Sequence, residues 1–486
     1  MALLNRGGGG RDRLSELPDG VIGHVLSFLP TKEAARAAAL ARSWRHKFAY
    51  VDAISFVEHV AHYGPSDDDD YTFFVDSVER RSKNGPLLDN INAALLCRRR
   101  CAGDLNAAPR AFRVQFGCYD NWDKAMVSQW LTHLLRRTPP ELHLDLRLQL
   151  TVIGEYQVGA CHNADDGCTA HSPYDADPFT LPARLFSCAA LRTLCLAGCA
   201  LNPPEVIHLP LLETLLLSSI NGQDCGTSIQ RLISCCPRLV DLTLERCGYT
   251  TPYLGGSYTI TVLDKHLRRL SLRCCHNLVK VTVDASVLRE FEYRGAVPAE
   301  AFLSLQGAHN ISSCHILGFC GDSVYRRDSP RLIRMFLEQF TGTRRLHMVS
   351  THLGSDMEFT LFPSLTKLEL TGCLHPTSVE AMTRILERAP SIQILSLFMY
   401  PHEVKDELTV PDVLIPCLRD RLREINLVHY QGHEAQRCMA KLLLSNAIVL
   451  ERLCVVFPRG PRELQIRLKN EIKEWVVNRS AETVFL

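Results

Sequence analysis

Four side chains of the types that bind zinc lie close together in this sequence. Cys161, His162, Cys168 and His171 fall within eleven residues, and thiolates and imidazoles are common zinc ligands. Their spacing differs from the C-x2-C and H-x3-H pairs of zinc modules. The surrounding segment, residues 159–178, is polar and contains Asp, Ala and Gly between these residues. We therefore interpret the segment as a loop and predict no metal site.

Two other clusters also have simple structural interpretations. Cys97 and Cys101 flank three arginines, and we expect the end of a helix with an exposed basic face. Asp67 to Asp70 form an acidic run without the ligand spacing or the glutamate of a calcium-binding loop. This run predicts a solvated linker.

Motifs of common enzymes are absent from the sequence. It contains no G-x-x-x-x-G-K-[ST] phosphate loop, no G-x-S-x-G elbow and no H-E-x-x-H zinc motif. Gly7 to Gly10 follow no predicted strand, so they indicate a flexible tail. We predict no catalytic residue and no cofactor.

Composition describes an ordinary water-soluble protein. The 486 residues are 46% hydrophobic and 22% charged, with a net charge of +1, which gives no sign of a nucleic-acid partner. The N-terminus has only a very short apolar run, so it predicts no signal peptide. The longest apolar stretch, residues 442–457, is interrupted by polar residues such as Asn446 and Glu451 and predicts no membrane span. We expect a protein of the nucleus or cytoplasm.

The first predicted elements are two short helices in residues 14–48. Leu17-Pro18 opens the first helix and Leu29-Pro30 ends it, because proline disfavours helix at the preceding residue. Thr31 is the expected N-cap of the second helix. The apolar positions of the first helix are Val21, Ile22, Val25, Leu26 and Leu29. A segment of this length cannot bury that surface alone, so it needs a partner.

These residues resemble an F-box, the adaptor-binding module of cullin-RING ubiquitin ligases. The resemblance covers residues 12–48 and rests on Leu17-Pro18-Asp19, the run LSFLPTKEA at residues 26–34, and Ser43-Trp44-Arg45. Alanines at residues 35 and 37–39 replace larger side chains of related modules. The resemblance implies docking onto a Skp-type adaptor, and through it to a cullin. The residues implied in that contact, or in the small core of the module, are Leu17, Pro18, Ile22, Val25, Leu26, Leu29, Pro30, Leu40 and Trp44.

A second pattern, L-x-x-L-x-L-x-x-C, recurs along the chain. It begins at Leu191, Leu239, Leu267 and Leu365 and ends at Cys199, Cys247, Cys275 and Cys373. With variants at Leu212 and Leu288, successive starts from 191 to 288 lie 21 to 28 residues apart, the interval of leucine-rich repeats. The pattern predicts an α/β solenoid with short parallel strands and helices on the convex side. These cysteines are then small buried residues and not a disulfide framework.

The array is predicted to extend beyond the regular repeats. A strand at residues 140–146 suggests a start near residue 110, and residues 288–343 leave room for two irregular repeats around Ile311, Cys314 and Ile316. Residues 379–389 have helical spacing.

The C-terminal part resembles the FBD domain that follows leucine-rich repeats in many plant F-box proteins. The anchors are Cys417-Leu418, Leu422, Tyr430, Gly432, Ala447 and Leu450. Helices expected at residues 432–447 and 463–478 would form a cap that covers the last repeat. The predicted organisation is a flexible N-terminus (1–11), an F-box (12–50), a linker and helical connection (51–109), leucine-rich repeats (110–410) and an FBD-like cap (411–486).

The resemblance implies a non-catalytic substrate-recognition subunit of an SCF-type ubiquitin ligase. Its expected partners are a Skp-type adaptor, a cullin and an unknown target protein, without nucleic acid or membrane. The alternative is a leucine-rich-repeat scaffold with a degenerate F-box, and a third hypothesis is a small-molecule receptor with the repeats as its pocket.

Target recognition would use strand positions that alternate with the leucines. The candidates are Asp241, Glu245, Arg269, Arg273, Glu292, Arg294, Lys367 and Glu369. Since neighbouring rows carry opposite charges, the alternative is that these side chains pair with one another.

Overall fold

The computed structural model forms two compact units, which are described separately. The described residues are 14–40, 44–57, 77–101, 108–116, 123–148, 178–220, 224–248, 256–263, 266–307, 311–320, 327–349, 357–373, 376–400 and 415–486.

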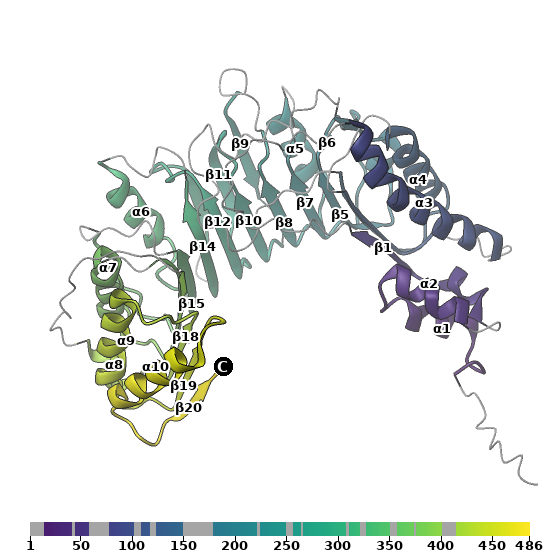
Figure 1. Ribbon diagram of the computed structural model, residues 1–486. Helices are drawn as coiled ribbons and strands as arrows, with labels where there is room; N and C mark the ends of the chain where they lie inside the picture. The colour runs from purple at the N-terminus through teal and green to yellow at the C-terminus, as the bar shows by residue number, and fades with distance from the viewer. Residues whose placement is uncertain are drawn as a thin grey trace, which may run out of the picture. The chain divides into compact units, whose positions relative to one another are not determined.

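The first unit begins with helices and continues as a parallel sheet of order β1-β2-β3-β5-β7 (Figure 1). Its elements are α1 (Asp19–Leu26), α2 (Thr31–Leu40), a 3-10 helix (Lys47–Tyr50), β1 (Ala53–Val57), α3 (Ser77–Cys101), β2 (Ala111–Gln115), α4 (Lys124–Arg136), β3 (Leu142–Arg147), β4 (Phe179–Thr180), a second 3-10 helix (Ala183–Ser187), β5 (Leu191–Ala197), β6 (Cys199–Ala200) and β7 (Thr214–Ser218). We call α1, α2, the first 3-10 helix and β1 the N-terminal module.

The second unit holds the longer run of parallel strands, in the order β8-β10-β12-β14-β15-β16-β17-β18-β19-β20. Its elements are α5 (Cys225–Ser234), β8 (Asp241–Glu245), β9 (Tyr258–Val262), β10 (Arg269–Arg273), β11 (Leu278–Asp284), β12 (Glu290–Gly295), β13 (Leu303–Gln306), β14 (Ser313–Phe319), α6 (Ser329–Glu338), β15 (Arg345–Val349), β16 (Lys367–Cys373), α7 (Pro376–Glu387), β17 (Ile394–Tyr400), α8 (Pro416–Asp420), β18 (Glu424–Val428), α9 (Glu434–Asn446), β19 (Arg452–Val456), α10 (Arg462–Trp475) and β20 (Glu482–Phe485).

The leucines of the repeated pattern lie in register and form the core. Leu270 of β10 pairs with Leu242 of β8 on one side and Phe291 of β12 on the other, and all three side chains are buried. Alternate residues of a strand point to opposite faces, so the intervening polar residues share the other face. The predicted fold class, an α/β solenoid of short parallel strands after N-terminal helices, is confirmed.

The second layer differs from the prediction in three successive repeats. There β9, β11 and β13 form a separate parallel sheet in place of the expected helices. The segments YTITV and LVKVTVD explain the difference, because their valines, isoleucine and threonines favour extended backbone and their buried residues alternate. Helices do follow elsewhere in this unit, at α6, α7 and α9.

Three local expectations also change. The sheet starts at β1, which pairs with β2, inside the segment predicted as a linker; its sequence AISFV lacks the leucine signature. Thr31 is the first residue of α2 and not its N-cap, and its hydroxyl accepts a hydrogen bond from the Ser55 amide at 2.7 Å. Arg98 is buried near the end of α3 and donates to the Val51 carbonyl, so at that position the basic face is not exposed.

The repeat cysteines occupy equivalent places. Cys199 and Cys247 are buried, and each Sγ donates to the carbonyl two residues earlier at 3.5 Å, as does the half-buried Cys275. Burial raises the pKa of the Cys199 thiol to about 12. No disulfide occurs among the cysteines whose side chains the structure describes.

Within the N-terminal module, α1 packs closely on the 3-10 helix. A Cβ atom built on Gly23 would lie 2.4 Å from the Tyr50 carbonyl oxygen, so only glycine fits there. Gly20, three residues earlier in the same helix, has no neighbouring atom within 4 Å of such a Cβ.

We predict opposite effects for alanine at these two glycines. Gly23→Ala should lower the free energy of unfolding of the module by about 1–3 kcal/mol, because it forces a backbone displacement. Gly20→Ala should raise it by about 0.5–1 kcal/mol through helix propensity. Urea denaturation of both variants tests this, and equal stability of Gly23→Ala and wild type would contradict the packing.

Candidate functional site

Helix α1 is apolar on two faces. Ile22 and Leu26 are each 1% exposed and form the core of the N-terminal module. The opposite face carries large apolar side chains that are 37% to 77% exposed. These are Leu17, Val21, Val25, Phe28 and Leu29, which we call the outer apolar stripe.

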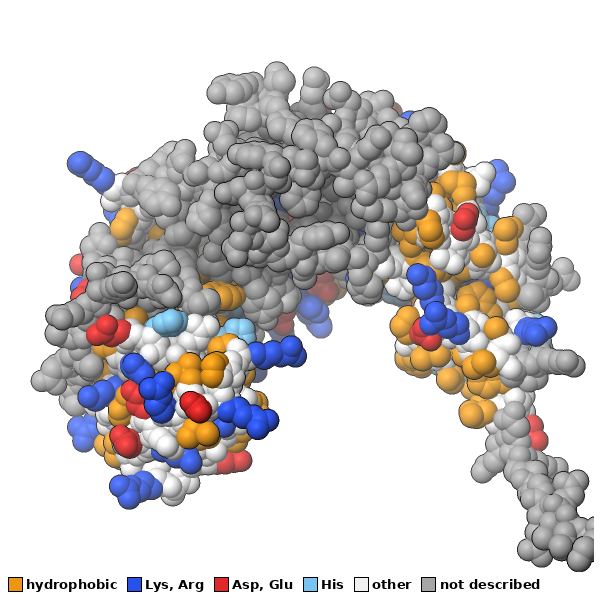
Figure 2. Space-filling model, viewed as in Figure 1, with side chains coloured by type: hydrophobic (Ala, Val, Ile, Leu, Met, Phe, Trp, Pro, Cys, Tyr) orange, Lys and Arg blue, Asp and Glu red, His pale blue; other side chains and the backbone are white. Residues whose placement is uncertain are grey.

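The outer apolar stripe is continuous because its members recur at helical spacing. Leu17, Val21 and Val25 lie four residues apart, and Phe28 and Leu29 follow in the turn after α1. Figure 2 shows hydrophobic side chains gathered over α1 and α2. A large exposed apolar surface of this kind indicates a contact with another molecule.

The structure separates the two roles that the sequence left together. Ile22 and Leu26 are core residues, whereas Leu17, Pro18, Val25, Leu29, Pro30 and Leu40 are exposed. Trp44 is half-buried, and its Nε1 donates to the Ser15 hydroxyl at 2.8 Å. Val21 and Phe28 were missed as site residues; Val21 was recognised only as an apolar helix position, although its spacing from Leu17 and Val25 carried the signal.

Two hydrogen bonds fix the helices of this module to the start of the sheet. The Ser27 hydroxyl accepts from the Asp52 amide at 2.8 Å, after α1, and Thr31 accepts from Ser55 at the start of α2. These bonds hold α1 and α2 in place, so the stripe would lose little conformational entropy when a partner binds.

A second feature of the module is a largely apolar hollow of about 470 Å³ beside α2. Ala35 and Ala39 line it together with Phe48, Phe56 and Ala94 of α3. The hollow exists because alanines of α2 leave space that larger side chains would fill.

On the polar face of the second unit, most of the proposed target-binding residues pair with one another. Arg269 lies 3.3 Å from Asp241 and 3.5 Å from Glu290, on the strands to either side. Arg273 contacts Glu292 at 2.5 Å.

The remaining target-binding candidates also lie in this network or beside it. Glu245 is 3.8 Å from Arg273, and Lys367 is 2.6 Å from Glu369. Arg294 is buried. The opposite-sign rows thus compensate one another, which was the alternative derived from the sequence.

A polar hollow of about 430 Å³ lies farther along the same face, over β12, β14, β15 and β16. His315 and His347 are neighbours in register, with ring centroids 5.8 Å apart. Arg344 and Arg345 line the hollow and are exposed, and neither guanidinium has an ion-pair partner in the described part of the chain. The sequence interpretation missed these four residues because strands β14 and β15 are both poor copies of the repeat.

Other sequence hypotheses stay without a structural test. Cys161, His162, Cys168 and His171 lie outside the described residues, as do the acidic run at residues 67–70 and the N-terminal glycines. Among the described helices, none is both long and apolar enough to span a bilayer.

Comparisons with known proteins agree with this architecture. The family model described as "F-box domain" matches residues 14–52, and the model described as "FBD-associated F-box protein At5g56370, LRR repeats" matches residues 168–301. The F-box/LRR-repeat protein At4g14103 of Arabidopsis thaliana is 28% identical over 49% of this chain and 50% of its own length.

Two other Arabidopsis thaliana proteins match along nearly the whole chain. Putative F-box/LRR-repeat protein At3g58920 is 24% identical over 91% of this chain and 92% of its own length. Putative F-box/FBD/LRR-repeat protein At4g00315 is 22% identical over 92% and 93%. The chain spans about half the length of the first relatives it matches. The resemblance to plant F-box/leucine-rich-repeat proteins with an FBD domain is confirmed.

His347 makes stability depend on pH. Burial lowers the pKa of His347, and His315 and Lys367 lower it further, while Glu369 and Glu292 oppose them. Below about pH 6.5 the unfolded chain therefore binds more protons at this position than the folded chain, and stability is lost as pH falls from there towards the lowered pKa of His347.

We predict that His347→Asn flattens this dependence. Chemical denaturation between pH 8 and pH 5 should show a smaller loss of unfolding free energy in the variant than in wild type. His208→Asn, at an exposed histidine outside the hollow, is the control and should keep the wild-type slope. Parallel pH profiles of His347→Asn and wild type would show that this group does not carry the effect.

Proposed function

We propose that this chain, which resembles plant F-box/leucine-rich-repeat proteins, is the substrate-recognition subunit of an SCF-type ubiquitin ligase. Its N-terminal module would dock onto a Skp-type adaptor, which links it to a cullin. The strand array would bind the protein to be modified. Nucleus and cytoplasm are the compartments in which we expect this role.

The outer apolar stripe is the observation that carries this proposal. Each large apolar side chain contributes roughly 1.5–3 kcal/mol when it moves from full exposure to full burial. Phe28 is 77% exposed and Val25 is 46% exposed. Burial of either side chain by a partner would therefore still contribute a substantial part of that free energy. Five such side chains on α1 and directly beside its ends are sufficient for a specific contact, even after the cost of association.

In this proposal the chain itself catalyses no reaction. It would hold a target next to the ubiquitin-transferring enzymes and so raise the effective concentration of target lysines. This role needs two separate binding surfaces at a maintained distance. The absence of enzyme motifs in the sequence fits such a receptor.

A scaffold with a degenerate F-box is the second candidate. The alanines of α2 and the hollow beside them favour it, because a helix with small side chains offers less apolar surface to an adaptor. The two candidates differ in one measurable property, the affinity for the adaptor.

We predict that Val25→Asp weakens adaptor binding at least about a hundredfold. Val25 is exposed in the free module, so the variant should fold, but its carboxylate would be buried without a partner in the complex. Titration calorimetry of the purified full chain with a plant Skp-type adaptor measures the effect. Val206→Asp, at an exposed valine outside the module, is the matched control.

Each outcome of this titration separates the candidates. Tight binding by wild type and Val206→Asp, lost in Val25→Asp, supports the ligase receptor. No binding by well-folded wild type would favour the scaffold, and unchanged binding by Val25→Asp would place the contact elsewhere.

For the target, we propose the polar face of the second unit, including the eight charged residues derived from the sequence. Each ion pair on this face contributes little free energy by itself. A target protein must also compete with the partners that these side chains already have. Arg344 and Arg345 differ because they are exposed and have no ion-pair partner among the described residues, next to a hollow of suitable size for a side chain. A target segment with acidic groups would fit them.

We predict that Arg344→Glu/Arg345→Glu keeps adaptor affinity and loses target association. Quantitative mass spectrometry of complexes isolated from proteasome-inhibited plant cells measures both. The matched control is Arg331→Glu/Arg334→Glu, on α6, where each arginine already pairs with glutamates. If both double variants retain the same associated proteins, the hollow is not the target contact.

A further inference from the structure

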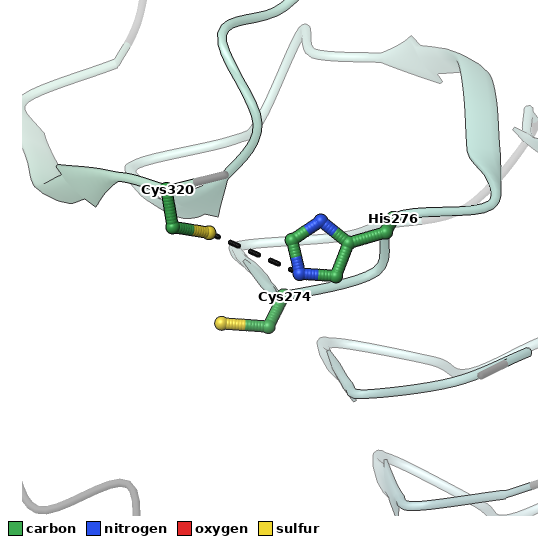
Figure 3. A group of neighbouring side chains, drawn as sticks. All are labelled: Cys274, His276 and Cys320. Atoms are coloured by element: carbon green, nitrogen blue, oxygen red, sulfur yellow. Dashed lines mark hydrogen bonds between the residues drawn. The ribbon is translucent and has the colours of Figure 1, made fainter. Parts of the chain in front are cut away.

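Three side chains of metal-binding types meet beyond the ends of two strands in the second unit. Cys274 and His276 follow β10, and Cys320 follows β14. Their ligand atoms all lie within 4.8 Å of one another, and the Cys320 Sγ is 3.9 Å from the His276 Nε2. Figure 3 shows the three side chains together, with Cys320 directed at His276.

The backbone explains why residues from two separated strands meet. The Cys274 amide donates to the Arg294 carbonyl at 2.6 Å, and the Cys320 amide donates to the Gly295 carbonyl at 2.8 Å. Both cysteines are thus anchored to adjacent carbonyls at the end of β12, the strand between β10 and β14. A Cβ built on Gly295 would lie 3.0 Å from the Tyr293 hydroxyl oxygen, so the glycine leaves room for the Tyr293 ring at the end of that strand.

The repeat pattern accounts for the backbone of this turn but not for these side chains. Cys274 has a φ of 51°, and Ser219, Arg246 and His429 adopt similar positive φ values after their own strands. The cysteine that the repeat uses is the next one, Cys275, whose Sγ donates back to the Arg273 carbonyl. Cys274 and His276 are the residues on either side of Cys275 in the turn that follows β10.

The third residue, Cys320, also lies outside the positions of the repeat pattern. Phe319 is the buried residue at the end of β14, and Cys320 is one residue beyond it. All three residues thus lie outside the leucine and cysteine positions of the repeat pattern, although Cys274 and Cys320 are buried.

We propose that Cys274, His276 and Cys320 bind a zinc ion. Two thiolates and an imidazole form a ligand set that zinc prefers, at about 2.3 Å for sulfur and about 2.1 Å for nitrogen. Small side-chain rotations would bring atoms that already lie within 4.8 Å onto one tetrahedral ion. Two thiolates also neutralise the charge of the ion, which permits its burial.

The arrangement leaves a fourth coordination position for water or for a ligand atom of a bound molecule. His276 is half-buried, whereas Cys274 and Cys320 are buried, so the ion would enter from the side of the histidine. The site is independent of the proposed ligase function, and the sequence alone, with its irregular spacing of 274, 276 and 320, predicted no metal here.

Cobalt titration of the full chain tests the site directly. Protein purified under reducing conditions and stripped with a chelator should bind one equivalent of Co²⁺, with thiolate-to-cobalt charge-transfer absorption and the intense visible bands of a tetrahedral ion. Zn²⁺ should displace the cobalt and abolish these bands. Cys274→Ser, Cys320→Ser and His276→Asn should each weaken binding at least about tenfold.

Cys454→Ser is the matched control, because it removes a half-buried thiol of β19 and should leave the spectrum unchanged. His276→Asn decides the test if the cysteine variants fail to fold, since its side chain is partly exposed. No stoichiometric cobalt spectrum in folded wild type, or an unchanged one in His276→Asn, would overturn the proposal. So would a Cys274–Cys320 disulfide detected by mass spectrometry in protein purified with reductant.

Discussion

Register between parallel strands is the constraint on which the rest of this structure depends. Each leucine row is buried only because the same row of the next strand lies beside it, as Leu244 lies beside Leu272 and Leu272 beside Tyr293. A shift by one residue would exchange the buried and the polar face of a strand. The register therefore also sets the places of the polar side chains and of the residues that follow each strand. Ion pairs such as Arg273–Glu292 and the cluster of Cys274, His276 and Cys320 result from it.

The N-terminal module follows a different rule. A helix at the surface of a protein normally has one apolar face, but α1 has two, and only the face of Ile22 and Leu26 is covered. Gly23 allows that buried face to approach the backbone of Tyr50, and the hydroxyls of Ser27 and Thr31 fix the helices to the residues around β1. Close packing on the inner side thus holds α1 in place and leaves the outer apolar stripe exposed on the other side.

The sequence predicted the features that depend on periodicity. The leucine spacing led to the parallel strands, and the two Leu-Pro steps led to the limits of α1 and the start of α2. It failed where local propensity overrode the repeat, as in the valine-rich β11, and where a strand lacked leucines, as in β1. Burial within α1 could not be assigned either. Ile22 and Val25 are both apolar at helical spacing, and only the position of the 3-10 helix decides which of them faces inward.

Electrostatic balance divides the polar face of the second unit into two parts. Across β8, β10 and β12, acidic and basic side chains alternate between neighbouring strands, and Arg269 lies between Asp241 and Glu290. Such a surface is already compensated, so a partner gains little from it. Across β14 and β15 the row continues with Ser313 and Arg345, followed two residues later by His315 and His347, and the alternation of charge stops. Neither Arg344 nor Arg345 has an ion-pair partner in the described part of the chain, although Glu290 and Glu369 line the same hollow, so charge is less evenly paired here than across β8, β10 and β12. The irregularity of the repeat, which hid this region from the sequence pattern, therefore coincides with the place where the alternation of charge ends.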